Sequence, residues 1–458
     1  MAAWTLSPLD ISFLSLESPA TPMTIGAVAV LDAADVDSAT LLALLRERAA
    51  VIPRLRRRLR SELFPVVGAS WVEDPDFRVE QHVRLHHAVG SGEPAELNAW
   101  VARTMATQLD RNRPLWEVHL LDGLADGRAG LLFKVHHAFL DGLGTGGLAY
   151  ALSDNGSPDH VPAPAPGPGA TPRPGLDPRR LLGPLAGLAD PPALARTAAR
   201  ALSTATGVIT HMTTAGPGFP FDTVVSSARA FTTTTVTLED LRGLRGVARG
   251  SVNDIAIGVV AGALRTWLQN HHYRPDDLRL RALVPVARER EPGSGSGNSF
   301  SAFLLDLPVH VADPVERIRA VSEEMGRHRA VGPEGGAGAL AGLTNLLPPA
   351  VVRLGGPTVA QTASKLFDML LTTVPVPRPL RLGGAPIIEV YPLAPLGPNQ
   401  PLAIGCSSYA GRMHVGFSVD PVVVPNPEQL AAAVPAELAV LRTVAGLRAP
   451  AVKVPAPR

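Results

Sequence analysis

Two adjacent histidines, His136 and His137, occur in the stretch KVHHAFLDGLG at 134–144, with an aspartate and a glycine shortly after them. A neutral imidazole at the base of a cleft can take a proton from a hydroxyl that attacks a carbonyl, if it lies within about 3 Å. Asp141 has the spacing to curl back and fix the ring or the turn, and Gly142 allows tight passage of the backbone. The stretch is therefore compatible with a general base, His137, supported by a structural carboxylate.

Other interpretations of the pair remain open. A metal site would need three or more ligands, and the chain has no HExxH, no CxxC and no second carboxylate nearby, so we expect no metal. A serine nucleophile is not indicated, because GxSxG is absent and GSGSG at 293–297 has glycine at the nucleophile position. Buried, hydrogen-bonded histidines are a real alternative, since histidine pairs also occur at 86–87 and 271–272 without a following Asp-Gly.

The motif is expected where a strand leaves a sheet. The run GLLFKVHH at 130–137 indicates a buried strand, and the glycine-rich segment after Asp141 is expected to open a helix. Strand ends are where α/β folds expose reactive side chains. Successive side chains of a strand point to opposite faces, so only one of His136 and His137 can address a cleft. The other is expected to hydrogen-bond within a core.

The rest of the 458-residue chain suggests two similar halves. Residues 24–31 indicate a buried strand, and the helical pattern that follows ends at Pro53. The second half predicts a hairpin that turns near Ala410 and Gly411. It also predicts a β-rich run at 228–238, a helix at 253–269 capped by Asn253, and a strand at 278–286.

A segment rich in proline and glycine, from Ser157 to Pro192, separates the halves and is a poor candidate for regular structure. We therefore predict an N-terminal domain with the histidine motif at 1–156 and a C-terminal domain at 216–458. Residues 157–215 would form a linker and an amphipathic helix.

Composition limits the choice of partners and compartment. The formal net charge is +1, from 42 Lys and Arg against 41 Asp and Glu, so no basic field points to nucleic acid. The single cysteine, Cys406, permits no internal disulfide and is expected to be a buried, inert thiol. No signal peptide is indicated, and the longest apolar window, 255–264, is too short to span a bilayer. We expect a cytoplasmic protein whose mean hydropathy of +0.15 leaves room for an apolar tunnel or a membrane-facing surface.

Several motifs, in order, resemble one family. HHxxxDG at 136–142 is similar to the signature of CoA-dependent acyltransferases, which include chloramphenicol acetyltransferase and peptide-synthetase condensation domains. Nearly the whole chain resembles the bacterial wax ester synthase/diacylglycerol acyltransferase family. The matching stretches are LSPLDISFLSLESPATPMTIGAVAVL, PRLRRRL, LDRNRPLWEVHLLDGL, NDIAIGVVAGALRTWL, RALVPVARE, GNSFSAFLLDLP and EVYPLAPLG.

The resemblance implies an α/β fold of two chloramphenicol-acetyltransferase-like domains, each a mixed sheet flanked by helices, with an active-site tunnel between them. It implies direct transfer of a fatty acyl group from acyl-CoA, a substrate, to a long-chain alcohol or diacylglycerol, without a cofactor. His137 would be the general base, Asp141 would hold the local geometry, and Asn253 would polarise the thioester carbonyl or position the base. The site residues implied are His136, His137, Asp141, Gly142 and Asn253 for catalysis, and Pro114, Leu115, Trp116, Asn298 and Thr373 for substrate binding.

Each of these roles has a structural alternative. Asn253 could simply be the N-cap of its helix. Pro114, Leu115 and Trp116 could pack in the core rather than form an acyl-binding wall. Arg288 could pair with Asp141 or be solvated.

One motif departs from the family pattern. Where the family has Asn-Val-Pro-Gly-Pro, this chain has TVPVP from Thr373 to Pro377. If the family glycine needs a positive φ, Val376 could adopt it only with strain. Substrate range and rate are the properties that this change puts in question.

An amphipathic helix is expected after Pro192, with an apolar stripe from Leu194 to Met212 and with Arg196 and Arg200 on its polar side. It could pack in the core, or lie on a membrane or lipid-droplet surface. Two other functions stay open: a condensation-type acyltransferase with another donor or acceptor, and a non-catalytic protein that binds lipid surfaces.

Overall fold

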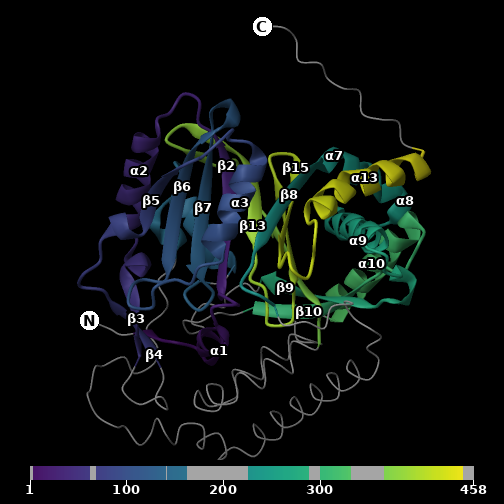
Figure 1. Ribbon diagram of the computed structural model, residues 1–458, viewed down its shortest axis with the longest axis horizontal. Helices are drawn as coiled ribbons and strands as arrows, with labels where there is room; N and C mark the ends of the chain where they lie inside the picture. Colours follow the sequence, from purple (N-terminus) through teal and green to yellow (C-terminus); the bar gives the residue numbers. More distant parts are fainter. Residues whose placement is uncertain are drawn as a thin grey trace, which may run out of the picture.

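Two six-stranded β-sheets stand side by side in the molecule, with helices packed on them (Figure 1). The computed structural model describes residues 4–61, 69–140, 142–161, 225–287, 300–331 and 366–446. In the view of Figure 1, α2 (Ser38–Ala50) covers the first sheet on one side of the molecule. On the opposite side, α9 (Val252–Asn270), α10 (Pro314–Val331) and α13 (Glu428–Val444) cover the second sheet. The expected α/β class with two sheet-containing units is confirmed.

The first sheet carries the histidine motif. Its strand order is β12-β13-β2-β7-β6-β5. The strands are β2 (Thr24–Asp32), β5 (Val83–His87), β6 (Trp116–Leu124), β7 (Arg128–His136), β12 (Arg381–Leu382) and β13 (Ala385–Leu393). β2 and β7 pair antiparallel at the centre and are buried along almost their whole length, which explains why both are mostly apolar. The strands predicted at 24–31 and 130–137 are confirmed, with β7 ending at His136.

Helices pack on both faces of this sheet. α2 and α4 (Gly142–Ala151) contribute to the large core on one face. α3 (Pro94–Met105) lies on the other face, where its buried side chains contact those of β2, β6 and β7. A small sheet of β1 (Trp4–Thr5), β4 (Ala69–Glu73) and β3 (Arg57–Ser61) completes this unit, together with α1 (Pro8–Leu16).

The second sheet has the strand order β10-β9-β11-β14-β15-β8. Its strands are β8 (Ala230–Thr237), β9 (Leu280–Ala287), β10 (Phe300–Leu307), β11 (Met369–Pro375), β14 (Leu402–Tyr409) and β15 (Arg412–Val419). Short helices α7 (Leu238–Gly243) and α8 (Arg245–Ala248) lead into α9. The predicted hairpin is confirmed as β14 and β15, and both turn residues, Ala410 and Gly411, have positive φ.

The two halves of the chain are interlocked. β13 comes from the second half but pairs with β2 in the first sheet. An apolar cluster then joins β2 and α3 to Phe231 of β8 and Tyr391 of β13. The domain boundaries expected at residues 156 and 216 remain a prediction. The helix predicted from Leu194 to Met212 lies outside the described residues, as does most of the linker.

The expected N-cap of α9 is wrong. Ser251, not Asn253, caps the helix: its side chain accepts from the Asp254 N–H, and Asp254 accepts from the Ser251 N–H. Asn253 occupies the second helical position. None of the helices in the described ranges is both long and apolar enough to cross a membrane.

Candidate active site

The histidine pair is held at the point where β7 leaves the first sheet. His136 is the last residue of β7 and lies opposite Thr24 of β2. The backbone N–H of His137 donates to the Met23 carbonyl at 2.8 Å. The side chain of His136 is fully buried, whereas His137 is partly exposed. The prediction that one histidine of the pair hydrogen-bonds within a core is confirmed for His136, and the expectation that His137 addresses a cleft remains a prediction.

His136 closes the turn that presents His137. Its Nδ1 accepts the backbone N–H of Ala138 at 3.0 Å, and its carbonyl accepts the N–H of Phe139 at 2.8 Å. Because Nδ1 is an acceptor, the neutral ring carries its proton on Nε2. That atom lies 3.6 Å from Oε1 of Glu17, whose side chain is 1% exposed.

Glu17, the residue that follows α1, is a site component that the sequence did not single out. Its Oε2 accepts from Nε and Nη2 of Arg111 at 3.0 and 2.7 Å. Burial acts to raise the pKa of Glu17, but His136 and Arg111 outweigh it and hold this pKa below its usual value. A buried carboxylate therefore faces the imidazole of His136 and fixes its orientation.

Phe13 of α1 was also missed. Its ring stacks on the imidazole of His137 with centroids 3.9 Å apart and an interplanar angle of 16°. The capping box between Ser7 and Asp10, with Pro8 in the first turn, fixes the start of the helix that carries Phe13. Phe13 and Glu17 both lie in the N-terminal stretch that resembles the family. That resemblance was the one signal in the sequence that could have pointed to them.

Asp141, Asn298 and Arg288 lie outside the described residues, so their predicted roles remain predictions. Gly142 is the first residue of α4, as expected for a helix that opens behind the motif.

The Pro-Leu-Trp segment lies in the core. Pro114, Leu115 and Trp116 are all buried, and Trp116 Nε1 donates to the Leu55 carbonyl at 2.7 Å. The Leu115 carbonyl accepts the backbone N–H of His136 at 3.0 Å. This placement supports the packing interpretation and adds a backbone link to the end of β7.

The two remaining candidates lie in the second unit. Asn253, at the start of α9, belongs to a helix on the far side of the second sheet from β7 (Figure 1). The role expected for Asn253 remains a prediction. Its neighbour Asp254 is fully buried and accepts two hydrogen bonds at 3.1 Å from Arg329 of α10. Thr373 lies in β11 opposite Cys406 of β14.

The TVPVP segment needs no left-handed backbone in this chain. Val376 is not among the residues with positive φ, and its N–H donates to the Ser408 carbonyl at 3.1 Å. The valine in place of the family glycine is therefore compatible with an unstrained backbone.

Cys406 has the inert environment that was expected. Its side chain is fully buried, and burial raises the pKa of its thiol to about 12. Within the described ranges, no group of three His, Cys, Asp or Glu side chains could hold a metal ion.

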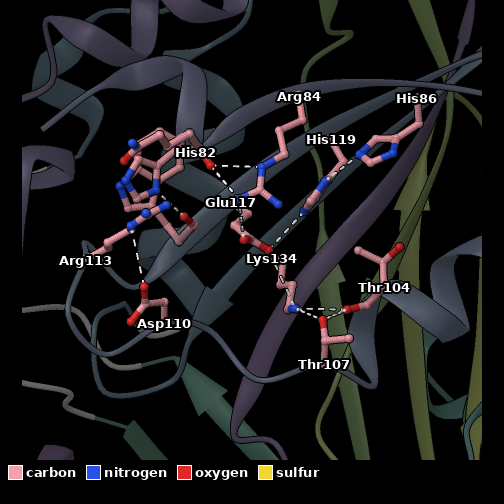
Figure 2. Close-up of polar contacts among 12 residues, drawn as sticks. His82, Arg84, His86, Thr104, Thr107, Asp110, Arg113, Glu117, His119 and Lys134 are labelled. Carbon is pink, nitrogen blue, oxygen red and sulfur yellow. Dashed lines mark hydrogen bonds and ion pairs between the residues drawn. The ribbon is translucent and has the colours of Figure 1, made fainter.

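A buried polar network extends from β7 across the first sheet (Figure 2). Lys134 of β7 lies opposite Glu117 of β6, with Nζ 3.6 Å from Oε2. Oε2 also accepts a hydrogen bond from His119 Nε2 at 3.2 Å. In a neutral His119 ring the proton is then on Nε2, so Nδ1 accepts from His86 Nε2 at 3.0 Å. Arg84 adds a second cation 3.3 Å from the carboxylate. Burial acts to raise the pKa of Glu117, but His119, Lys134 and Arg84 together lower it to about 2.

This low pKa predicts an acid-sensitive contribution to stability. The carboxylate stabilises the fold fully above its unfolded pKa of 4.5, and this contribution is lost as the pH falls toward 2. A shift of this size corresponds to about 3 kcal/mol. We expect Glu117→Gln to have a lower melting temperature than the wild type at pH 7. The difference between the two melting temperatures should become smaller between pH 5 and pH 3. Glu323 is exposed, so Glu323→Gln serves as the control. A melting-temperature difference between Glu117→Gln and the wild type that does not change with pH would contradict the prediction.

These features define a two-unit α/β fold that presents one accessible histidine, supported by a buried one, at a strand end. The family model of the wax ester synthase/diacylglycerol acyltransferase catalytic domain matches residues 6–256, and that of the WS/DGAT C-terminal domain matches residues 296–442. The chain belongs to the wax ester synthase/diacylglycerol acyltransferase family.

Relatives and solved structures agree with this assignment. The chain is 30% identical to a Mycobacterium tuberculosis protein named probable diacylglycerol O-acyltransferase tgs1, over 96% of both chains. It is 28% identical to one named tgs2, over 96% of this chain and 99% of the relative. The wax ester synthase/diacylglycerol acyltransferase of Marinobacter aquaeolei VT8 has a similar fold, with a TM-score of 0.70, 24% identity, and coverage of 97% of this chain and 100% of that one.

Condensation domains share the fold as well. The starter condensation domain of rhizomide synthetase superposes with a TM-score of 0.58 at 16% identity, over 97% of this chain and 95% of that one. The expected relation to the chloramphenicol-acetyltransferase-like fold is therefore confirmed.

Proposed function

We propose that the protein is an O-acyltransferase that moves a fatty acyl group from acyl-CoA to a long-chain alcohol or a diacylglycerol. The observation that carries the proposal is the partly exposed residue His137 at the end of β7, backed by a buried His136 and with its ring stacked on Phe13. Membership of the family and the names of the relatives support the choice of donor and acceptors.

In this proposal His137 acts as a general base. It takes the proton of the acceptor hydroxyl as the oxygen attacks the thioester carbonyl. The new C–O bond forms, the C–S bond breaks, and the proton passes from the imidazolium to the departing CoA thiolate. Asp141 would hold the local geometry, as the family resemblance implies.

Transfer is proposed to be direct. Cys406, the chain's one cysteine, is buried and its pKa is raised, so it offers no thiolate for an acyl-enzyme.

The test combines turnover with intact mass. Palmitoyl-CoA with hexadecanol or dipalmitoylglycerol should release CoA thiol and form wax ester or triacylglycerol, and palmitoyl-CoA alone should leave the protein mass unchanged. Absence of product with every hydroxyl acceptor, but amide formation with hexadecylamine, would replace this function with a condensation-type one. A stable acyl adduct would refute direct transfer.

The acceptors stay in a lipid phase, so we further propose that the enzyme works in the cytoplasm on a membrane or lipid-droplet surface. Flotation with anionic liposomes tests this, and a protein that stays at the bottom of the gradient would contradict it.

A further inference from the structure

A small cavity lies between the two units, next to the backbone that holds the histidine pair. It measures about 30 Å³ and most of its lining is apolar. Its lining includes Pro22 and Thr24 near the histidine pair, Val101, Ala102 and Met105 of α3, and Phe231 of β8. Pro22 and Thr24 flank Met23, whose carbonyl accepts the N–H of His137. The cavity therefore adjoins the backbone segment that positions His137.

The cavity is too small for a fatty chain unless one of its walls moves. A volume of about 30 Å³ is roughly the volume of one water molecule in the liquid. One wall is the last part of α3, which contributes Val101, Ala102 and Met105. The position of the C-terminal end of α3 is therefore one of the boundaries of the space that a chain could occupy.

Lys134 holds that end of α3. Its Nζ donates to the Thr104 carbonyl at 2.9 Å and to Oγ1 of Thr107 at 2.8 Å (Figure 2). The last carbonyls of a helix lack partners within the helix and carry partial negative charge, so a cation is stabilising there. Lys134 stands two residues before His136 on β7, so one strand positions both the histidine pair and the cavity wall.

The ammonium group itself is fixed in place. Lys134 is fully buried, and Glu117 faces it across the β6–β7 ladder at 3.6 Å. Removing an ion pair from water is costly, and an apolar pair of similar size is often at least as stable. Stability alone therefore gives little reason for a charge here, whereas fixed geometry at the end of α3 does.

We propose that Lys134 is a positioning residue that limits the interdomain cavity through the end of α3, and that this cavity receives the alkyl chain of a substrate. The inference rests on the proposed function for the identity of the chain, which belongs either to the acyl donor or to the acceptor. Both sources supply the same chemistry, a saturated alkyl chain, and the arms of the experiment distinguish them.

The experiment measures binding, so that its outcome is independent of catalysis. Dissociation constants are measured by calorimetry for non-hydrolysable alkyl-CoA thioethers of 10 and 16 carbons, and for alcohols of 8 and 12 carbons. In Lys134→Met the end of α3 is no longer held. The preference for the longer member of one series, measured as a ratio of dissociation constants, should therefore rise about tenfold. A single methylene in an apolar pocket changes such a ratio by at least that much. A response in the thioether series would identify the chain as that of the acyl donor, and a response in the alcohol series as that of the acceptor.

Two further variants separate positioning from general damage. Thr107→Val removes one of the two hydrogen bonds at an exposed residue and should shift the same series by a smaller factor. Arg317→Met breaks a buried ion pair to Glu437 in the second unit and should lower the melting temperature without changing either length preference. Length preferences that stay unchanged in Lys134→Met and Thr107→Val would overturn the inference. Failed turnover by the wild type would overturn only the proposed function.

Discussion

Replacing His137 with alanine should lower the rate of acyl transfer by about 10²–10⁴-fold, the usual loss when a positioned general base is removed. The histidine is partly exposed, and its backbone hydrogen bond to Met23 does not depend on the side chain. Its ring stacks on that of Phe13. The variant should therefore fold, and the loss should appear in kcat rather than in the melting temperature.

A matched control comes from the other histidine pair in the same sheet. His87 is a largely exposed histidine at the end of β5, and His87→Ala should leave transfer nearly unchanged. The measurement is CoA thiol release over a range of pH, together with thermal unfolding of each variant. If folded His137→Ala kept most of its turnover, the general-base assignment would be wrong.

The local fold around the motif was predictable because it depends on short-range rules. An apolar run of strand length predicts β7, and the period of two along a strand separates His136 from His137. The same rules gave the hairpin at Ala410 and Gly411, where positive φ favours glycine.

The supports of the motif were not predictable in this way, because they come from distant parts of the chain. Glu17 and Phe13 reach the histidines only through the packing of α1 against the end of β7, and no local pattern encodes that contact. The entry of β13 into the first sheet is of the same kind.

The α9 cap is a different case, since the signal was present. Asn, Ser and Asp all suit an N-cap, so residue type alone cannot choose among them. The spacing of Ser251 and Asp254 matches a capping box with Asp in the acidic position, and it favours Ser251. Asn253 is thereby left without a capping role.

His136→Ala should act mainly on stability and only indirectly on the rate. The change leaves the Ala138 N–H without its acceptor and the Glu17 carboxylate without the imidazole that faces it. An unsatisfied buried polar group costs about 1–3 kcal/mol. We therefore expect a melting temperature several degrees lower, and a smaller loss of kcat than in His137→Ala, because the turn that presents His137 is loosened.

Two readouts distinguish this supporting role from a second catalytic role. The pH profile of kcat should keep its midpoint in His136→Ala, since the titrating base is unchanged. Glu17→Gln keeps the size of the side chain but removes its charge, and its effect should overlap with that of His136→Ala in the double variant, because the two side chains form one unit. Additive stability losses, or a midpoint that moves in His136→Ala, would mean that the buried histidine does more than hold the turn.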